Sequence, residues 1–293
     1  MALTASAVPE SLGWLRQSDA GRRWLASLPH LVQECARRWS LRVGPPYPDS
    51  HVSLAAPAHQ EDGDDVILKI QFPHRESLHE AAALAAWNGN GAIRVLAVDD
   101  DRRALLLEQC RPGNHLSELA GDDALGVIIG LLPRLWVPAA APFRRLADEA
   151  AQWAEELPTW WERAGRPFEI TLLEAALAVL EVLPESQGEQ VLLHQDLHPD
   201  NVLRATREPW LVIDPKPLVG EREFGVACVI RSAGLGHSAA LVEQRLDRLT
   251  TELTLDRERA RGWALVHALA WSFENDTVLP RHVETARWLH ALA

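Results

Sequence analysis

The sequence has few cysteines and no long hydrophobic run. Cys35, Cys110 and Cys228 are odd in number and far apart, and no pair has metal-ligand or redox spacing, so a disulfide framework is not expected. A reducing cytosol suits such a chain. The longest apolar run, residues 125–132, is far shorter than the ~20 residues of a membrane crossing, and the first thirty residues contain no apolar stretch of signal-peptide type. We therefore expect a cytoplasmic protein without a membrane segment.

Basic residues are also fewer than acidic ones. The chain carries 29 Lys and Arg against 41 Asp and Glu, a net charge of -12. Such a chain repels nucleic acid, and any polyphosphate it binds needs local cations or a metal ion. The excess of acidic side chains either keeps the protein soluble or attracts a polycationic substrate. With 293 residues, 47% hydrophobic and 24% charged, the chain has a globular composition and suits two domains or one two-lobed fold.

Residues 1–108 have the pattern of a small sheet with one inserted helix. Helical spacing over 10–39 predicts two short helices divided by Pro29. A further helix is predicted from Pro73 to Trp87, between two hairpins. The strands predicted for these hairpins are 52–56, 66–70, 93–98 and 104–108.

Residues 109–114 contain Pro112 and Gly113 and form the predicted linker, because helical periodicity takes over from Ser117. Residues 115–293 are then a larger, mainly helical C-terminal lobe, and Asp256 is the expected N-cap of one of its helices. The predicted class is α+β, with a small β-rich N-terminal lobe. The late helices are predicted at 241–253, 256–273 and 281–292.

Strand-like segments interrupt the helical half between residues 191 and 213. If 202–204 and 210–212 are the arms of an antiparallel hairpin, Asn201 and Asp214 become neighbours at its open end. A carboxylate and a carboxamide oxygen there suit magnesium bound jointly with phosphates. Asp196, on the preceding loop, supplies a carboxylate that can orient an attacking hydroxyl and accept its proton.

Two spacings in the sequence are those of kinases. His194, Asp196 and Asn201 reproduce the spacing His-x-Asp-x-x-x-x-Asn. Lys69 lies on a predicted strand and Glu80 on the following helix, where a carboxylate can hold the lysine against nucleotide phosphates. Two alternatives stay open: Glu76, one helical turn away, as the partner, or a merely solvated lysine at the end of a strand.

Three further segments are distinctive: His-Gln-Asp-Leu-His-Pro-Asp-Asn at 194–201, Trp-Leu-Val-Ile-Asp-Pro at 210–215 and Leu-Val-Gly-Glu at 218–221. Together they resemble the aminoglycoside phosphotransferase family, most closely its streptomycin-kinase and hydroxyurea-kinase branch. Residues 69–73, the Trp-Asn-Gly segment at 87–89 and residues 105–108 also fall in family order. The resemblance implies a protein-kinase-like bilobal fold and an enzyme that uses ATP and Mg²⁺ to phosphorylate a hydroxyl of a small molecule. The implied acceptor is a streptomycin-like aminoglycoside, which phosphorylation inactivates.

The resemblance also implies roles for individual residues. By matching position, Asp196 is the catalytic base, Asn201 and Asp214 are the metal ligands, and Lys69 binds phosphate. Backbone groups around Glu108 to Cys110 hold adenine, and the acceptor lies over the C-terminal lobe. A cationic acceptor needs acidic partners. The candidates are Glu221, Glu274 and Asp276, and the alternative for each is a plain surface role.

The sequence departs from the family pattern at a few positions. Gln195 stands where many relatives have glycine, and the expected nucleotide-covering turn at 48–53 has no glycine. Pro215-Lys-Pro217 follows Asp214 in place of Phe-Gly, a pattern that resembles this branch of the family and not the protein kinases, so phosphorylation of proteins is not expected. The alternatives are a kinase of hydroxyurea or another small metabolite, a relative that binds nucleotide or ligand without turnover, and a transition-metal hydrolase using His194, Asp196 and His198. No pattern indicates an oligomeric state.

Overall fold

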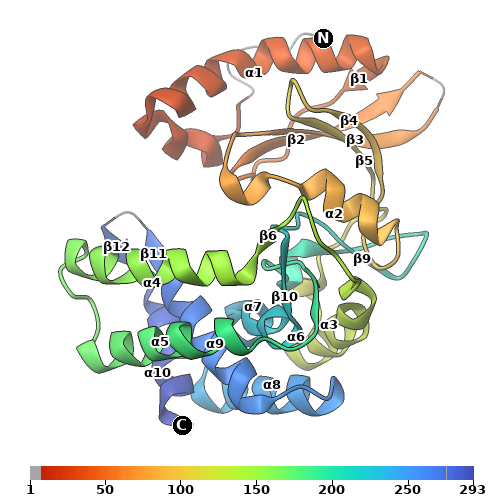
Figure 1. The fold of residues 1–293 in the computed structure, drawn as a ribbon. Helices are drawn as coiled ribbons and strands as arrows, with labels where there is room; N and C mark the ends of the chain where they lie inside the picture. The colour runs from red at the N-terminus through yellow and green to blue at the C-terminus, as the bar shows by residue number, and fades with distance from the viewer. Residues whose placement is uncertain (1–7, 62, 275) are drawn as a thin grey trace.

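The computed structural model describes residues 8–61, 63–274 and 276–293, which form two lobes of unequal size (Figure 1). A five-stranded sheet and its helices make the smaller, N-terminal lobe, and helices dominate the larger lobe. The predicted α+β class with a small β-rich lobe is therefore confirmed. Within the described part of the chain, no helix combines the length and the apolar character that a membrane crossing requires.

The sheet of the N-terminal lobe is antiparallel throughout, in the order β1-β2-β3-β5-β4. Both predicted hairpins are present. β2 extends beyond the predicted strand, because the low strand propensity of Ala-Ala-Pro-Ala at 55–58 is overcome by pairing with residues 66–69 of β3. β1 has no counterpart among the predicted strands. The bounds are β1 Leu41–Val43, β2 Ser53–Gln60, β3 Asp65–Gln71, β4 Val95–Asp99 and β5 Ala104–Glu108.

One long helix, α1 (Asp19–Arg38), covers a face of this sheet and follows a 3₁₀ helix over Glu10–Gln17. The prediction of two helices divided at Pro29 is wrong, because Pro29 lies inside α1. The division comes at Ser18, whose side-chain oxygen accepts a hydrogen bond from the Gly21 amide at 3.0 Å and caps α1. Burial against the sheet offsets the hydrogen bond that Pro29 cannot donate, and the buried side chains include Trp24, Leu28 and Val32.

The second helix of this lobe, α2 (Glu80–Trp87), lies between the sheet and the larger lobe (Figure 1). It begins later than its predicted start at Pro73, because His79 adopts a left-handed conformation with φ of 70° and breaks the helical path. The Trp87 indole donates a hydrogen bond to the Leu135 carbonyl oxygen in the larger lobe at 2.8 Å. Contacts with both lobes therefore fix the position of α2.

The larger lobe is built around α9 (Arg257–Ala270), most of whose side chains are buried. The predicted late helices are confirmed as α8, α9 and α10. Asp256 caps α9 as predicted, since its carboxylate accepts a hydrogen bond from the Arg259 amide at 3.0 Å. The other helices are α3 Gly121–Leu135, α4 Leu146–Arg163, α5 Ile170–Val182, α6 Arg222–Gly225, α7 Ala227–Arg231, α8 Ala239–Glu252 and α10 Pro280–Ala291.

Short strands hold the loops of the larger lobe. β7 pairs with β10, and the arms of the β8–β9 hairpin are the predicted ones. In β9, Val212 donates a backbone hydrogen bond to Gly91 and accepts one from Ile93, which ties the hairpin to the segment after α2. The bounds are β6 Arg144–Arg145, β7 Gln190–Leu193, β8 Val202–Arg204, β9 Trp210–Val212, β10 Leu218–Glu221, β11 Phe273–Glu274 and β12 Thr277–Val278.

The contact between β10 and α4 leaves no room for a side chain at Gly220. A Cβ placed there would lie 2.5 Å from the Leu146 Cβ, whereas one at Gly188 would meet nothing within 4 Å. We expect Gly220→Ala to lower the free energy of unfolding by about 1–3 kcal/mol through overpacking. The matched Gly188→Ala should leave it within about 1 kcal/mol. Urea unfolding of both variants measures the difference, and equal stabilities would contradict this packing.

Candidate active site

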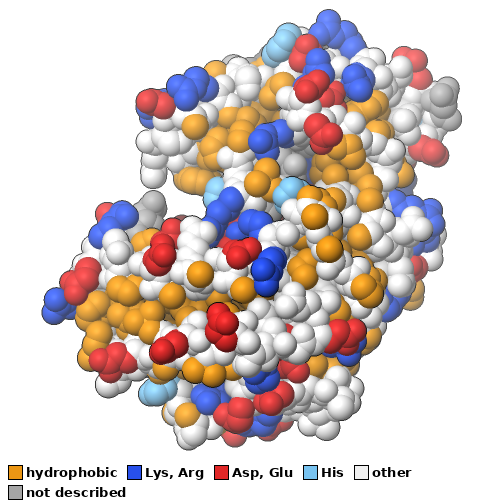
Figure 2. All heavy atoms as spheres, in the orientation of Figure 1, with side chains coloured by type: hydrophobic (Ala, Val, Ile, Leu, Met, Phe, Trp, Pro, Cys, Tyr) orange, Lys and Arg blue, Asp and Glu red, His pale blue; other side chains and the backbone are white. Residues whose placement is uncertain are grey.

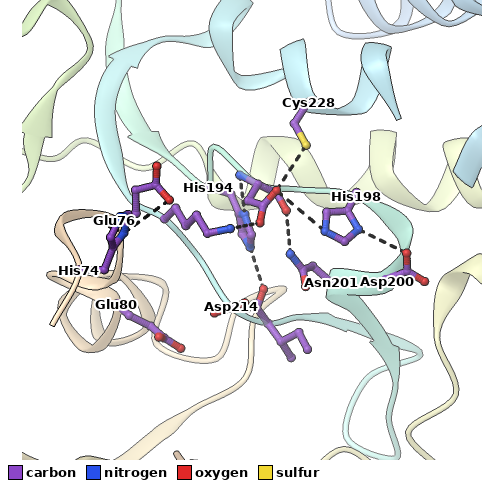
Figure 3. A network of polar contacts seen from close by, with 12 residues as sticks. His74, Glu76, Glu80, His194, His198, Asp200, Asn201, Asp214 and Cys228 are labelled. Carbon is purple, nitrogen blue, oxygen red and sulfur yellow. Dashed lines mark hydrogen bonds and ion pairs between the residues drawn. The ribbon is translucent and has the colours of Figure 1, made fainter. Parts of the chain in front are cut away.

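Lys69 lies in β3 at the junction of the two lobes, with its side chain buried. Its ammonium donates to Oε1 and Oε2 of Glu80 at 2.8 and 2.7 Å, and to Oδ1 of Asp214 at 2.6 Å. Burial alone would lower the pKa of Lys69, but the two carboxylates raise it above its usual value. The structure thus brings Lys69 and Glu80 together. The alternative partner Glu76 lies beside His74 instead (Figure 3).

Gln71 holds Glu80 in place and has no motif that would identify it from the sequence. Its side-chain amide donates to Oε2 of Glu80 at 2.5 Å. Gln71 is two residues beyond Lys69 in β3, and alternate residues of a strand share one face. The spacing is therefore the one signal that could have placed Gln71 next to the lysine.

The loop between β7 and β8 carries the His-x-Asp-x-x-x-x-Asn spacing, and His194 fixes its shape. The ring is buried, and its Nε2–H donates to the Ile213 carbonyl oxygen at 2.9 Å (Figure 3). The Trp87 indole of α2 stacks on it, with the ring centroids 6.1 Å apart. Burial lowers the pKa of His194 to about 4, so the ring is neutral at pH 7. Because Nε2 is already bonded to Ile213, that nitrogen does not support the transition-metal alternative.

Asp196 follows on this loop and is also buried. One carboxylate oxygen forms an ion pair with the Lys216 ammonium. The other lies 3.9 Å from the Cys228 thiol and 3.9 Å from His198 Nε2 (Figure 3). The Asn201 side-chain amide donates to the Asp196 backbone oxygen at 2.9 Å, which brings the two residues together.

Asn201 and Asp214 meet at the open end of the β8–β9 hairpin, as the register predicts. The Ile213 amide donates to the Asn201 backbone oxygen at 2.9 Å. Because the Asn201 amide group is turned toward Asp196, its oxygen is left to accept other bonds, and Lys69 occupies only Oδ1 of Asp214. The nearby ammonium groups of Lys69 and Lys216 outweigh the effect of burial and lower the pKa of Asp214, so it is ionised. These free hard oxygens fit Mg²⁺ shared with phosphates and water.

Glu108 stands at the end of β5, where the chain leaves the small lobe. Its carboxylate accepts from Nε and Nη2 of Arg207, at 2.8 and 3.0 Å, and from the Arg94 amide at 2.9 Å. Burial opposes ionisation, but the bonds from Arg207 and Arg94 lower the pKa of Glu108. Cys110 is partly exposed, and burial raises the pKa of its thiol to about 12.

Arg207 belongs to the turn between β8 and β9 and had no sequence signal. Besides Glu108, it donates to the backbone oxygens of Gly89 at 2.7 Å and Ala92 at 3.0 Å. One guanidinium therefore joins the end of β5, the segment after α2 and the hairpin that carries Asn201. The close approach of these segments fixes how the lobes meet.

The three acidic candidates for acceptor contacts have different surroundings. Glu221 is buried at the end of β10, paired with Arg259 at 2.8 Å and hydrogen-bonded to Trp263, so the structure does not bring it to Asp196. Its strand neighbour across the β7–β10 pair is Gln190, at the far end of β7 from the His194 loop. Glu274 and Asp276 lie on the exposed β11–β12 segment, and Asp276 pairs with Arg163 at 2.9 Å.

Arg231, His267 and the half-buried His282 form a hydrogen-bonded group next to Asp196 that was not identified from the sequence. Arg231 Nη2 is 4.0 Å from Oδ1 of Asp196. Its Nε donates to His267 Nδ1 at 2.9 Å, and its Nη1 donates to His282 Nε2 at 2.8 Å. His282 Nδ1–H donates in turn to the Trp271 carbonyl oxygen at 2.8 Å. Burial first, and then Arg231, lower the pKa of both histidines, that of His282 to about 4.

Neutral buried histidines make the fold sensitive to acid. His194 and His282 have a pKa of about 4 in the folded chain and about 6.5 when unfolded, so only the unfolded chain takes up their protons between these values. Their contribution to stability is complete above about pH 6.5 and is lost as the pH falls toward 4.

We expect His282→Gln, which keeps an acceptor and a donor, to reduce the slope of unfolding free energy against pH by up to about 1.4 kcal/mol per unit in this window. Urea unfolding from pH 7 to 4 measures it, with the exposed His51→Gln as the control. A slope in His282→Gln equal to that of wild type would contradict the assigned hydrogen bonds.

Comparisons with known proteins agree with this geometry. A family model described as aminoglycoside/hydroxyurea antibiotic resistance kinase matches residues 38–276. Streptomycin 6-kinase of Streptomyces griseus is 37% identical over 284 residues, 92% of each chain. Hydroxyurea phosphotransferase of Kitasatospora aureofaciens is 40% identical over 266 residues, 88% of this chain and 77% of the relative.

Solved structures show the same fold at much lower identity. The crystal structure of choline kinase LicA from Streptococcus pneumoniae has a TM-score of 0.62 and 12% identity, and covers 89% of this chain and 99% of that one. The resemblance predicted from the sequence motifs is confirmed. The match over residues 38–276 and the identity to the streptomycin and hydroxyurea kinases show that the chain belongs to the aminoglycoside/hydroxyurea antibiotic resistance kinase family.

Proposed function

We propose that this chain transfers the γ-phosphate of ATP to a hydroxyl of a streptomycin-like aminoglycoside and so inactivates it. The observation that carries the proposal is the position of Lys69, whose ammonium lies 2.6–2.8 Å from both Glu80 and Asp214. A lysine held by a helix carboxylate beside a metal-binding Asp is the arrangement that kinases use to grip nucleotide phosphates. Asp196 lies on the adjoining loop, where an acceptor hydroxyl can meet those phosphates.

Asp196 is the proposed catalytic base. Its buried carboxylate orients the acceptor hydroxyl toward phosphorus and takes the proton as the new bond forms. Because phosphoryl transfer passes through a loose transition state, positioning matters more than strong basicity. An ion-paired carboxylate such as that of Asp196 is suited to this role.

Asn201 and Asp214 are the proposed ligands of Mg²⁺, through the oxygens that the hairpin leaves free. Mg²⁺ held by these two residues would neutralise part of the charge on the nucleotide phosphates. Lys69 adds a second cation to the phosphates, and Glu80 keeps its ammonium aimed at them.

Residues 109–114 are the proposed linker between lobes 1–108 and 115–293, with adenine against backbone groups from Glu108 to Cys110. The two bonds from Arg207 to Glu108 support this role, because they hold the start of the linker against the larger lobe. With three free cysteines, the protein is proposed to work in the cytoplasm.

The streptomycin kinases supply the main support for an aminoglycoside acceptor. The Streptomyces glaucescens streptomycin 6-kinase is also 37% identical, over 88% of this chain. Glu274 and Asp276, exposed on the larger lobe, are the proposed contacts for acceptor cations. Glu221 is already paired with Arg259, so an acceptor would have to displace that pair.

The second candidate acceptor is hydroxyurea, which the 40% identity to a hydroxyurea phosphotransferase favours.

An acceptor screen tests the proposed reaction. We expect streptomycin, within a panel of aminoglycosides, hydroxyurea and simple sugars, to stimulate ADP release in the presence of ATP and Mg²⁺. Asp196→Ala should lower kcat by at least about 10²-fold, since it removes the group that orients the hydroxyl and accepts its proton. Mass spectrometry of the acceptor identifies the product. If no acceptor raises ADP release above that of Asp196→Ala, the proposal fails.

A matched pair of substitutions tests whether the Glu80 carboxylate holds the Lys69 ammonium in position. Glu80→Gln removes the charge that holds the ammonium, and we expect kcat/KM for ATP to fall by at least about tenfold. Glu76→Gln, in the neighbouring turn, should change it less than Glu80→Gln does, because Glu76 lies beside His74 and its charge acts on Lys216, whereas Glu80 and Asp214 hold Lys69. Initial rates at varied ATP give both values. Equal effects at the two positions would refute the assignment of Glu80.

A further inference from the structure

The chain contains only two lysines, Lys69 and Lys216, against 27 arginines. Arginine supplies nearly every surface cation, and both lysines are instead largely buried at the active site. Lys69 is bonded to Asp214 and Lys216 to Asp196. A sequence that uses arginine almost everywhere thus keeps lysine at two positions, each against one of the two active-site aspartates.

Lys216 is held against Asp196 by the chain that follows Asp214. Its backbone amide donates to the His194 carbonyl oxygen at 3.0 Å, which fixes the residue against the catalytic loop. The ammonium lies 5.0 Å from the centre of the Trp271 ring. Figure 2 shows Lys, Arg and His side chains gathered where the molecule is hollowed between the lobes.

A purely structural role for Lys216 is a poor explanation, because Arg231 already fills it. The Arg231 guanidinium lies against the same Trp271 ring, also at 5.0 Å, and 4.0 Å from Oδ1 of Asp196. Two histidines fix its orientation. Lys216 bonds to Oδ2, whereas Arg231, Cys228 and His198 all lie near Oδ1. Lys216 therefore covers the oxygen that these three residues leave for an acceptor hydroxyl. A flexible ammonium with three donors can give up or share that oxygen, whereas a fixed guanidinium cannot.

We propose that Lys216 is a catalytic residue, whose ammonium turns from Asp196 to the γ-phosphoryl group when nucleotide binds. This inference rests on the phosphotransfer proposed above. The turn frees Oδ2 of Asp196 for the acceptor and places a second lysine on the transferring group, opposite Lys69. The acceptor oxygen then bonds to the γ-phosphorus, the bond from that phosphorus to the β–γ bridging oxygen breaks, and ADP leaves. The hydroxyl proton passes to Asp196 and then to water.

Kinetics of Lys216 variants give the first measurement. We expect Lys216→Met to lower kcat by about 10²–10³-fold, as the loss of one charge-stabilising group does, with less than about threefold change in KM for the acceptor. Lys216→Arg should lose at least about tenfold, because the longer planar group cannot turn within the same space. Arg22→Met, on the exposed surface of α1, removes one cation elsewhere and should keep wild-type kcat. A Lys216→Met variant with kcat within threefold of wild type would overturn the proposal.

The two-lysine composition allows a second readout that needs no acceptor and no turnover. Lysine labelled with ¹⁵N at the ammonium gives two side-chain NMR signals, and Lys216→Arg assigns them. We expect Mg²⁺ with a non-hydrolysable ATP analogue to shift both signals in wild-type protein, and Asp196→Asn to shift the Lys216 signal without nucleotide.

The pattern of shifts separates two kinds of failure. If the analogue moves the Lys69 signal and leaves that of Lys216 unchanged, nucleotide binds as proposed but Lys216 serves only Asp196, and the inference is wrong. If neither signal moves at saturating analogue, the ATP-dependent function itself fails, and this inference with it. Because the shifts are measured in wild-type protein and Lys216→Arg serves only to assign the signals, this experiment tests the inference even where Lys216→Met does not fold.

Discussion

The ion cluster of Lys69, Glu80 and Asp214 is the interaction on which the arrangement of the site depends. Its members come from β3, from α2 and from the end of the β8–β9 hairpin, so it forms only when the lobes meet correctly. The pair that joins the lobes is Lys69–Asp214, and because the Asp214 side chain is 38% exposed, breaking it costs less than the about 3–5 kcal/mol of a fully buried pair. This pair favours the correct position of the lobes and also holds the lysine where phosphates must bind.

The surrounding contacts hold the residues of that cluster in position. Trp87 of α2 bonds to Leu135 and stacks on His194, so the helix that carries Glu80 and the loop that carries Asp196 share one support. Beyond the C-terminal end of α2, Arg207 bonds to the segment that follows the helix and to Glu108. A change in the angle between the lobes would disturb several of these directional bonds together. The geometry is therefore preformed before any substrate binds.

The parts of this site that are local in sequence could be predicted. The 202–204 and 210–212 arms have strand-like residues around a turn, and their register alone makes Asn201 and Asp214 neighbours. Glu80 follows Lys69 closely enough that a strand and a helix bring them together. Pro29 misled the helix prediction, since a buried helix face can outweigh one lost hydrogen bond.

Long-range partners could not be predicted, because no periodicity encodes them. Arg207 reaches Glu108 across 99 residues, and Arg231 reaches His267 and His282 in other helices. Each is one of 27 arginines, and nothing local distinguishes it from those on the surface. Lys216 was not predicted either, although its being one of only two lysines in the sequence is a signal that could have marked it.

Charge balance connects these residues to the acidic character of the whole protein. Three cations, Lys69, Lys216 and Arg231, face three carboxylates, those of Glu80, Asp214 and Asp196, so the cluster is close to neutral within a chain of net charge -12. A neutral cluster in an acidic protein offers little attraction to a free polyphosphate. Neutralising part of the polyphosphate charge with a divalent ion removes that repulsion, and the free oxygens of Asn201 and Asp214 hold the ion beside Lys69. Nucleotide and metal should therefore bind interdependently, with Lys69 already in place beside the metal site and Lys216 turning toward the phosphates.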